Sequence, residues 1–86
     1  MSPSAVVMYT TSWCPYCQRA RKLLASKQVP IEEIDVEAES GKRDEMQSRS
    51  GRRTVPQIFI GDRHIGGSDD LQALEDAGEL DSLLGR

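Results

Sequence analysis

Two cysteines, Cys14 and Cys17, stand three residues apart in the run Cys-Pro-Tyr-Cys. An apolar run rich in strand-forming residues precedes them at 5–9, and apolar side chains recur at helical spacing over 14–27. Cysteines at this spacing at the start of a helix lie within reach of a disulfide bond. The pattern therefore predicts a pair that can pass between the dithiol and the disulfide.

The two cysteines are expected to have different roles. The first cysteine at a helix start faces unpaired backbone N–H groups and the positive end of the helix dipole, and both favour a thiolate. Cys14 is therefore the candidate nucleophile, with an exposed sulfur, and Cys17, a turn deeper, is the candidate resolving thiol. Pro15 suits the first helical position, where the N–H that proline lacks has no partner.

Two other uses of a cysteine pair stay open at this point. A structural zinc ion needs about four ligands, whereas the chain offers one cysteine pair and one histidine, His64, so no metal site is expected within one chain. Two buried, unreactive cysteines would also fit the spacing. The polar residues Thr11 and Ser12 before the pair, together with Pro15, argue against an inert pair.

Strands and helices alternate along the rest of the chain in the order β-α-β-α-β-β-α. The expected strands are 5–9, 31–36, 57–60 and 63–65, and the expected helices are 14–27, 39–50, one that follows Ser68 and a short turn at 80–84. Met46 is the only good apolar anchor of the second helix. This order predicts an α/β fold, with a four-stranded mixed sheet and helices on both faces.

Single residues mark where these elements start and stop. Gly51 is expected to end the second helix, and Gly61-Asp62 is typical of a type II′ hairpin turn. Ser68 is expected to be the N-cap of the third helix, with Asp69 and Asp70 in the first turn, where the helix dipole favours acids.

Size and charge exclude several classes of protein. The 86 residues are expected to form one domain, and a net charge of −3 argues against general nucleic-acid binding, which calls for a basic surplus. The longest apolar runs, such as Ala5–Met8, span four residues, whereas a membrane helix needs about 20. The N-terminus has no signal-peptide pattern, so we expect a cytoplasmic protein without nucleic-acid or membrane partners.

Three motifs, in this order along the chain, resemble those of the glutaredoxin family. Cys14-Pro15-Tyr16-Cys17 resembles its dithiol centre, Thr54-Val55-Pro56 its loop with a cis Val–Pro bond, and the run from Gly66 to Leu71 its glutathione-binding turn. The resemblance covers roughly residues 5–84. It implies a thioredoxin-like fold, a single glutaredoxin domain over 1–86, and a thiol–disulfide oxidoreductase that uses glutathione as its reductant.

The resemblance also implies how glutathione binds. The start of the third helix offers backbone N–H groups to the γ-glutamyl carboxylate, and the Asp69 carboxylate suits the ammonium group. Val55 pairs through its backbone with the cysteinyl residue, and Arg52 or Arg53 supplies a cation for the glycyl carboxylate. The full set of expected glutathione ligands is Tyr16, Arg52, Arg53, Thr54, Val55, Pro56, Gly67, Ser68 and Asp69.

The activity that the resemblance implies is reduction of glutathionylated proteins and of protein disulfides by a monomer. An alternative is a dimer that carries a [2Fe-2S] cluster on Cys14 and glutathione. Relatives specialised for that role usually have Cys-Gly-Phe-Ser, so Cys17 and Pro15 disfavour it. A third possibility, reduction by thioredoxin reductase in place of glutathione, is disfavoured by Ser68-Asp69 and by the loop 54–56.

Four single positions add detail. Many relatives have lysine where this chain has Thr11, and some bacterial relatives have a third cysteine where it has Ser68. Trp13 is expected to be an exposed aromatic at the lip of the site, either a contact for substrate proteins or a packing residue. His64 is expected on the surface, without a catalytic role.

Overall fold

Four strands form one mixed sheet in the order β2-β1-β3-β4. The computed structural model describes residues 5–85. The strands are β1 (Val6–Thr10), β2 (Ile31–Asp35), β3 (Gln57–Ile60) and β4 (Arg63–Gly66). β1 pairs in parallel with β2 and antiparallel with β3, and β3 pairs antiparallel with β4. The predicted four-stranded mixed sheet is confirmed.

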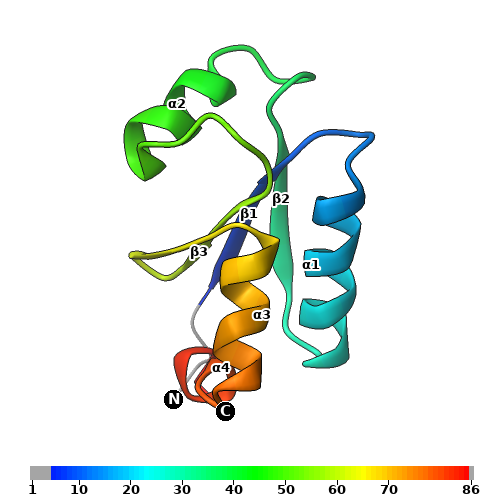
Figure 1. Cartoon of the computed structure of the whole chain (residues 1–86). Helices are drawn as coiled ribbons and strands as arrows, with labels where there is room; N and C mark the ends of the chain where they lie inside the picture. The colour runs from blue at the N-terminus through cyan, green and yellow to red at the C-terminus, as the bar shows by residue number, and fades with distance from the viewer. Residues whose placement is uncertain (1–4, 86) are drawn as a thin grey trace.

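Helices cover both faces of this sheet, as expected (Figure 1). The helices are α1 (Pro15–Ser26), α2 (Lys42–Ser50), α3 (Ser68–Asp76) and α4 (Leu80–Leu83). α1, α3 and α4 pack on one face and α2 on the other. Within residues 5–85, no helix is both long and apolar enough to cross a membrane.

The core is divided by the sheet because successive strand residues point to opposite faces. Met8 and Ile58 pack with the buried leucines of α1, α3 and α4, whereas Tyr9 and Phe59 pack with Met46 of α2. This arrangement leaves the end of β1 and the start of β3 near the starts of α1 and α3, where the cysteines lie (Figure 1).

A polar contact supplements the thin apolar face of α2. Met46 is its only buried residue, as the sequence predicted. The Tyr9 hydroxyl, from the buried strand β1, donates to Glu45 at 2.6 Å and accepts from Arg49 at 2.8 Å. The Arg49 guanidinium also lies 4.1 Å from the centre of the Phe59 ring, so charged side chains of α2 extend its contact with the sheet.

The predicted boundaries differ most from the structure in α2, whereas those of β1, β2, β4, α1 and α4 differ by one residue. α2 begins at Lys42 and not at residue 39, because Gly41 adopts a left-handed conformation with φ 80° directly before it. Gly51, with φ 72°, ends the helix as predicted. Gly61 has φ 60° in the hairpin turn, the sign that the first position of a type II′ turn requires.

Candidate functional site

Cys14 is the N-cap of α1, and its side chain closes the first turn of that helix. Its backbone is extended, with φ −151° and ψ 106°, and its Sγ accepts the Cys17 backbone N–H at 3.2 Å. Pro15 occupies the first helical position, as predicted. Both cysteines are free thiols. A cysteine that caps the start of a helix has the position that the sequence predicted for the nucleophile.

The Cys14 sulfur is less open than expected. Cys14 is 8% exposed, and its Sγ lies 3.8 Å from the carbonyl oxygen of Val55, to which the thiol donates. The expectation of an exposed sulfur is therefore wrong for the free protein. The loop that contains Val55 covers one side of the sulfur.

Cys17 lies deeper and is held as a thiol. It is fully buried, with 0% exposure. Burial, and after it the hydrogen bond with the Cys14 side chain, raises the pKa of the Cys17 thiol to about 12. Cys17 is thus the less accessible and the less acidic thiol expected of a resolving cysteine, and its role stays a prediction.

A pocket of about 300 Å³ lies beside the cysteines, between the loop 54–56, the start of α3 and Tyr16. Its lining residues are Tyr16, Arg52, Thr54, Val55, Pro56, Gly67, Ser68, Asp69 and Asp70. These are the residues expected from the sequence to bind one ligand, except that Arg53 is absent and Asp70 is added. The Val55–Pro56 bond is cis, as the resemblance implied.

The N-cap of α3 is Gly67 and not Ser68, which is the first helical residue. The Asp70 carboxylate, three positions into the helix, accepts the Gly67 backbone N–H at 2.9 Å. A Cβ at Gly66, where φ is 117°, would overlap that carboxylate. The expected cap was wrong because the helix begins one residue earlier, and Asp70 reaches back to accept the N–H of its N-cap residue, Gly67.

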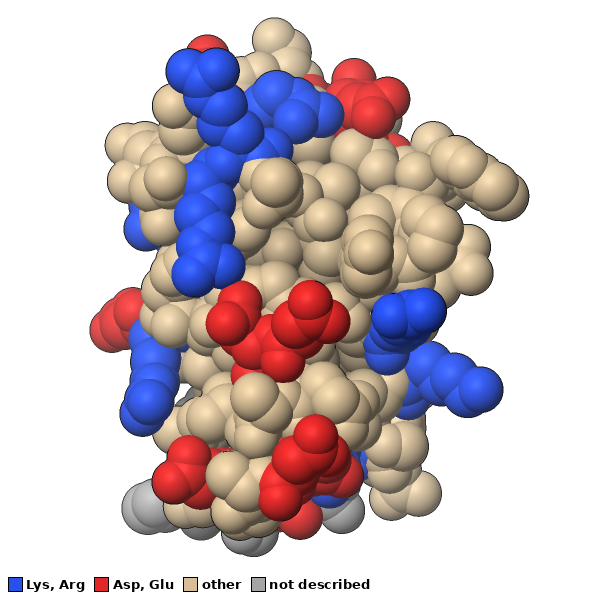
Figure 2. Space-filling model, viewed as in Figure 1, with Lys and Arg blue, Asp and Glu red and all other residues tan. Residues whose placement is uncertain are grey.

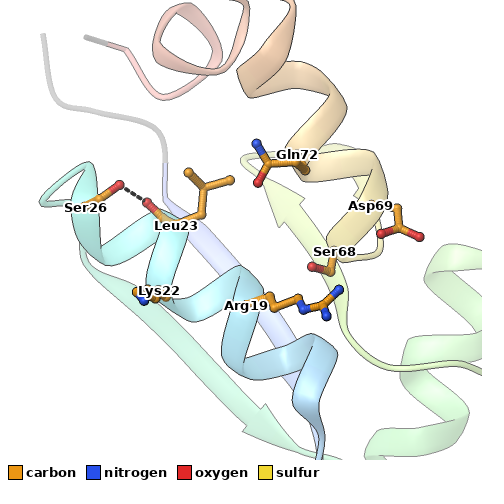
Figure 3. Close-up of a pocket in the computed structure, with 7 residues that line it drawn as sticks. All are labelled: Arg19, Lys22, Leu23, Ser26, Ser68, Asp69 and Gln72. Atoms are coloured by element: carbon orange, nitrogen blue, oxygen red, sulfur yellow. Dashed lines mark hydrogen bonds between the residues drawn. The ribbon is translucent and has the colours of Figure 1, made fainter.

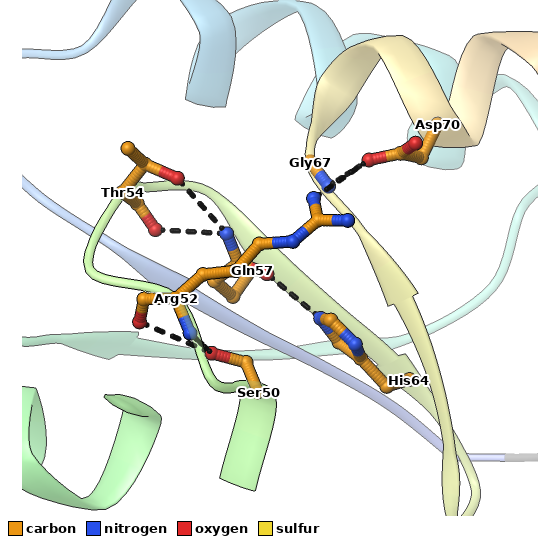
Figure 4. Close-up of polar contacts among 7 residues, drawn as sticks. All are labelled: Ser50, Arg52, Thr54, Gln57, His64, Gly67 and Asp70. Atoms are coloured by element: carbon orange, nitrogen blue, oxygen red, sulfur yellow. Dashed lines mark hydrogen bonds and ion pairs between the residues drawn. The ribbon is translucent and has the colours of Figure 1, made fainter. Parts of the chain in front are cut away.

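Asp70 also connects the turn to the loop across the pocket (Figure 4). Arg52 Nη1 lies 3.1 Å from Asp70 Oδ2, the same oxygen that accepts from Gly67. The Gly67 N–H, and after it the Arg52 guanidinium, lowers the pKa of Asp70. Sequence reasoning did not assign Asp70 to the site, although its spacing from Gly67 is that of a capping acid.

We expect Asp70→Ala to lower the free energy of unfolding by about 1 kcal/mol at pH 7, the usual cost of a lost cap. Because the pKa of Asp70 is lower in the folded protein, its charge stabilises the fold above the unfolded value of about 3.9. That contribution is lost as the pH falls through the folded pKa. Urea denaturation at pH 7 and pH 3 should therefore show a smaller difference at pH 3, with Asp76→Ala as control. An equal difference at both pH values would contradict a charge-dependent cap.

Gln57 links the loop 54–56 to β4 (Figure 4). Its side chain is fully buried, and its Nε2 donates to the carbonyl oxygen of Thr54 at 3.0 Å and to the Thr54 hydroxyl at 3.1 Å. Its Oε1 lies 2.8 Å from Nε2 of His64. Since the amide nitrogen already donates to Thr54, Oε1 is the acceptor and His64 Nε2 the donor. Gln57 therefore holds the backbone of the loop in place.

The sequence predicted a surface position for His64, but the structure places it half-buried. Its ring lies 4.9 Å from the Phe59 ring, centre to centre. Burial, followed by the positive charge of Arg52, lowers the pKa of His64, so the ring is mainly neutral at pH 7. Neither Gln57 nor His64 could be assigned from local sequence, because nothing in the pattern of a strand marks a polar pair across a hairpin.

Replacing Gln57 with leucine should leave Thr54 and His64 without their buried partner. We expect the free energy of unfolding to fall by about 1–3 kcal/mol, the cost of unsatisfied buried groups. His64→Leu removes the other half of one hydrogen bond. The double variant should lose less than the sum of the two single losses in urea denaturation. Additive losses would mean that the two side chains act independently.

Two aromatic side chains form the lip of the site. Trp13 is 83% exposed and Tyr16 is 53% exposed. The Arg19 guanidinium lies over the Tyr16 ring, 5.5 Å from its centre. Thr11 is buried and its hydroxyl donates to the carbonyl oxygen of Trp13 at 3.5 Å. The predicted exposure of Trp13 is confirmed, so it is available for contact with a partner.

Known proteins match the chain over most of its length. A glutaredoxin family model matches residues 6–65. Glutaredoxin 3 of Escherichia coli strain K12 is 56% identical over 79 residues, which are 92% of this chain and 95% of that protein.

Solved structures agree with the sequence relatives. The solution structure of a glutaredoxin from Brucella melitensis has 58% identity and a TM-score of 0.85, over 98% of this chain and 91% of that one. The crystal structure of a buckwheat glutaredoxin–glutathione complex has 32% identity and a TM-score of 0.87, over 95% and 77%. The fold is thus thioredoxin-like, as the resemblance implied. The family model matches residues 6–65, and the relatives from Escherichia coli and Brucella melitensis are 56% and 58% identical to this chain. The chain therefore belongs to the glutaredoxin family of thiol oxidoreductases.

Proposed function

We propose that the chain is a glutathione-dependent oxidoreductase that reduces protein–glutathione mixed disulfides and protein disulfides. One observation carries the proposal. The sulfur of Cys14, at a helix start, lies against the carbonyl oxygen of Val55, and Val55 lines a pocket formed by the expected glutathione ligands. A small thiol bound in that pocket would have its sulfur beside Cys14.

The charges around the pocket suit the two ends of glutathione. The start of α3 offers backbone N–H groups to the γ-glutamyl carboxylate, and the Asp69 carboxylate offers a partner for the ammonium group. The pocket volume of about 300 Å³ is at the lower end of small-molecule sites. The buckwheat relative, solved as a complex with glutathione, supports the same ligand here.

We propose Arg52, and not Arg53, as the partner of the glycyl carboxylate. Arg52 lines the pocket, whereas Arg53 does not. The ion pair of Arg52 with Asp70 is about half exposed. A pair so open to water contributes little stability, so the guanidinium can share or exchange its partner when a ligand carboxylate arrives.

The first reaction needs only Cys14. Its thiolate attacks the glutathione sulfur of a glutathionylated protein, the mixed disulfide breaks, and the protein leaves as a thiolate that takes up a proton. Cys14 now carries glutathione. The thiolate of a second glutathione attacks the glutathione sulfur on Cys14, releasing glutathione disulfide and restoring the Cys14 thiolate.

The second reaction needs both thiols. Cys14 attacks a protein disulfide and forms a mixed disulfide with the protein, and Cys17 then gives up its proton and attacks the Cys14 sulfur. The protein leaves reduced, and two glutathiones reduce the Cys14–Cys17 disulfide in turn. In the mixed disulfide Cys14 carries no negative charge, so the part of the raised Cys17 pKa that comes from Cys14 is removed.

A coupled assay tests the proposed function. The protein is supplied with glutathione, glutathione reductase, a reduced nicotinamide cofactor and a small glutathione mixed disulfide, and cofactor oxidation is followed. We expect turnover that depends on glutathione. Turnover with thioredoxin reductase in place of glutathione would overturn the proposal.

We propose one domain over residues 1–86, which acts as a monomer in the cytoplasm on glutathione and on disulfide-containing proteins. Colour and size of the purified protein provide a separate check. A brown dimer would favour the cluster carrier, in which two chains share a [2Fe-2S] cluster through Cys14 and glutathione.

A further inference from the structure

A second pocket, of about 440 Å³, lies between α1 and α3 (Figure 3). From α1 it is lined by Arg19, Lys22, Leu23 and Ser26, and from α3 by Ser68, Asp69 and Gln72. Leu23 provides apolar surface, and the aliphatic stems of the two cations add to it. The pocket therefore combines an apolar interior with positive charge on one wall.

The positive charge on this wall is not neutralised by an ion pair with any residue that the structure describes. No carboxylate of residues 5–85 lies within ion-pair distance of Arg19 or Lys22, whereas Arg21 of the same helix pairs with Glu33. The sequence of α1 contains no acidic residue. Although the net charge is −3, two cations beside the site thus have no ion-pair partner among residues 5–85.

The charge pattern of this face is uneven (Figure 2). Lys and Arg side chains gather over α1 on one side and over α2 and the loop after it on the other, with acidic side chains between them at the start of α3. An acidic ligand is therefore attracted to the α1 side. A basic ligand would meet like charges there.

The second pocket adjoins the proposed glutathione site. Ser68 and Asp69 line both pockets, and the Arg19 guanidinium extends from α1 toward them while it also lies over Tyr16 (Figure 3). In the proposed function the Asp69 carboxylate is occupied by the glutathione ammonium group. The charges that remain for a further group are then those of Arg19 and Lys22.

We propose that this pocket binds an acidic segment of the protein substrate, next to the cysteine that carries glutathione, and so selects substrates by charge. The inference rests on the proposed function. Glutathione occupies the first pocket and the attached polypeptide spreads over the surface around it. A glutamate or aspartate side chain can then place its carboxylate near Lys22 and Arg19, with its methylene groups against Leu23.

Two peptide substrates test the inference. Each has one cysteine joined to glutathione by a disulfide, and they differ only in the residues on either side of it, which are glutamate in one and lysine in the other. The coupled assay gives kcat/KM for each. We expect the wild-type protein to prefer the acidic peptide, and Lys22→Glu to lower the acidic-to-basic ratio about tenfold. Raised ionic strength should reduce the wild-type preference.

Arg43→Glu is the matched control, because it makes the same change in net charge on α2, on the opposite face of the sheet. It should leave the ratio unchanged. An unchanged ratio in Lys22→Glu, or an equal change in Arg43→Glu, would overturn the inference. The small mixed disulfide separates the two proposals, since a wild-type protein without turnover on it refutes the proposed function. Normal turnover on it with no charge preference between the peptides refutes only this inference.

Discussion

Replacing Cys14 with serine should abolish reduction of every disulfide substrate. Cys14 is the N-cap of α1, and its sulfur accepts a backbone N–H at 3.2 Å beside the pocket. Serine preserves the cap but lacks a thiolate that can attack sulfur. The fold should therefore remain, and circular dichroism with urea denaturation should confirm that it does. Measurable turnover by folded Cys14→Ser would mean that Cys17 can act as a nucleophile.

Cys17→Ser should separate the two reactions. Cys17 is fully buried and its thiol pKa is raised to about 12, so it is poorly suited to attack a substrate from solution. Free glutathione can replace it in the reduction of glutathione mixed disulfides, which should therefore persist. Protein disulfides that need the second thiol should no longer be reduced. The check is the coupled assay with a glutathionylated peptide and, separately, with a disulfide-containing protein.

The outcome of Cys17→Ser decides whether glutathionylated substrates need Cys14 alone or both cysteines. If it were as inactive as Cys14→Ser toward the glutathionylated peptide, both thiols would be needed for every substrate. The route through Cys14 and a second glutathione would then be wrong. Pro15→Ala provides a matched control, since it changes the same turn of α1 without removing a thiol.

Asp69→Ala should lower turnover with glutathione by roughly tenfold or more, which corresponds to about 1.4 kcal/mol and to the loss of one charge-assisted hydrogen bond. Asp69 is exposed and lines the pocket in the first turn of α3. A tripeptide offers little apolar area, so much of its affinity must come from its charged ends. The measurement is kcat/KM for glutathione in the coupled assay.

Dithiothreitol provides the control for Asp69→Ala. It carries no ammonium group, so its reduction of the Cys14–Cys17 disulfide should hardly change. As a plain first-turn acid, Asp69 would contribute only a few tenths of a kcal/mol to the helix. Asp76→Ala, in the last turn of the same helix, should leave both reductants unaffected. Equal losses with both reductants in Asp69→Ala would show that Asp69 supports the fold and does not bind the ligand.

Much of the fold followed from local patterns. Alternation and helical spacing of apolar residues gave the order of strands and helices, and Gly51 and Pro15 marked a helix end and a helix start as expected. These features can be predicted because the apolar periodicity of a helix or strand, and the residues of a turn, involve positions close together in the chain. The boundary of α2 was less well predicted, since Met46 is its only buried anchor and its polar contacts come from β1.

The sequence predicted the individual residues that line the pocket less well than it predicted the fold. Arg52 and Arg53 are equivalent in sequence, and only the structure shows that Arg52 lines the pocket and pairs with Asp70. Ser68 was expected to cap α3, but Asp70 supplies the acceptor to Gly67. These differences depend on where side chains point after the elements have packed, which residue spacing does not determine.

The sequence alone was enough to predict the chemistry that we propose for this protein, because a cysteine pair at a helix start, with Pro15 between, predicts a nucleophile and a resolving thiol. Only the tertiary structure decided the surroundings of that pair. Val55, 41 residues from Cys14 along the chain, covers its sulfur, and Gln57 fixes the loop through His64 and Thr54. The physical reason is that these contacts form between separate strands and loops once the sheet is assembled. The local spacing of apolar residues therefore does not predict them.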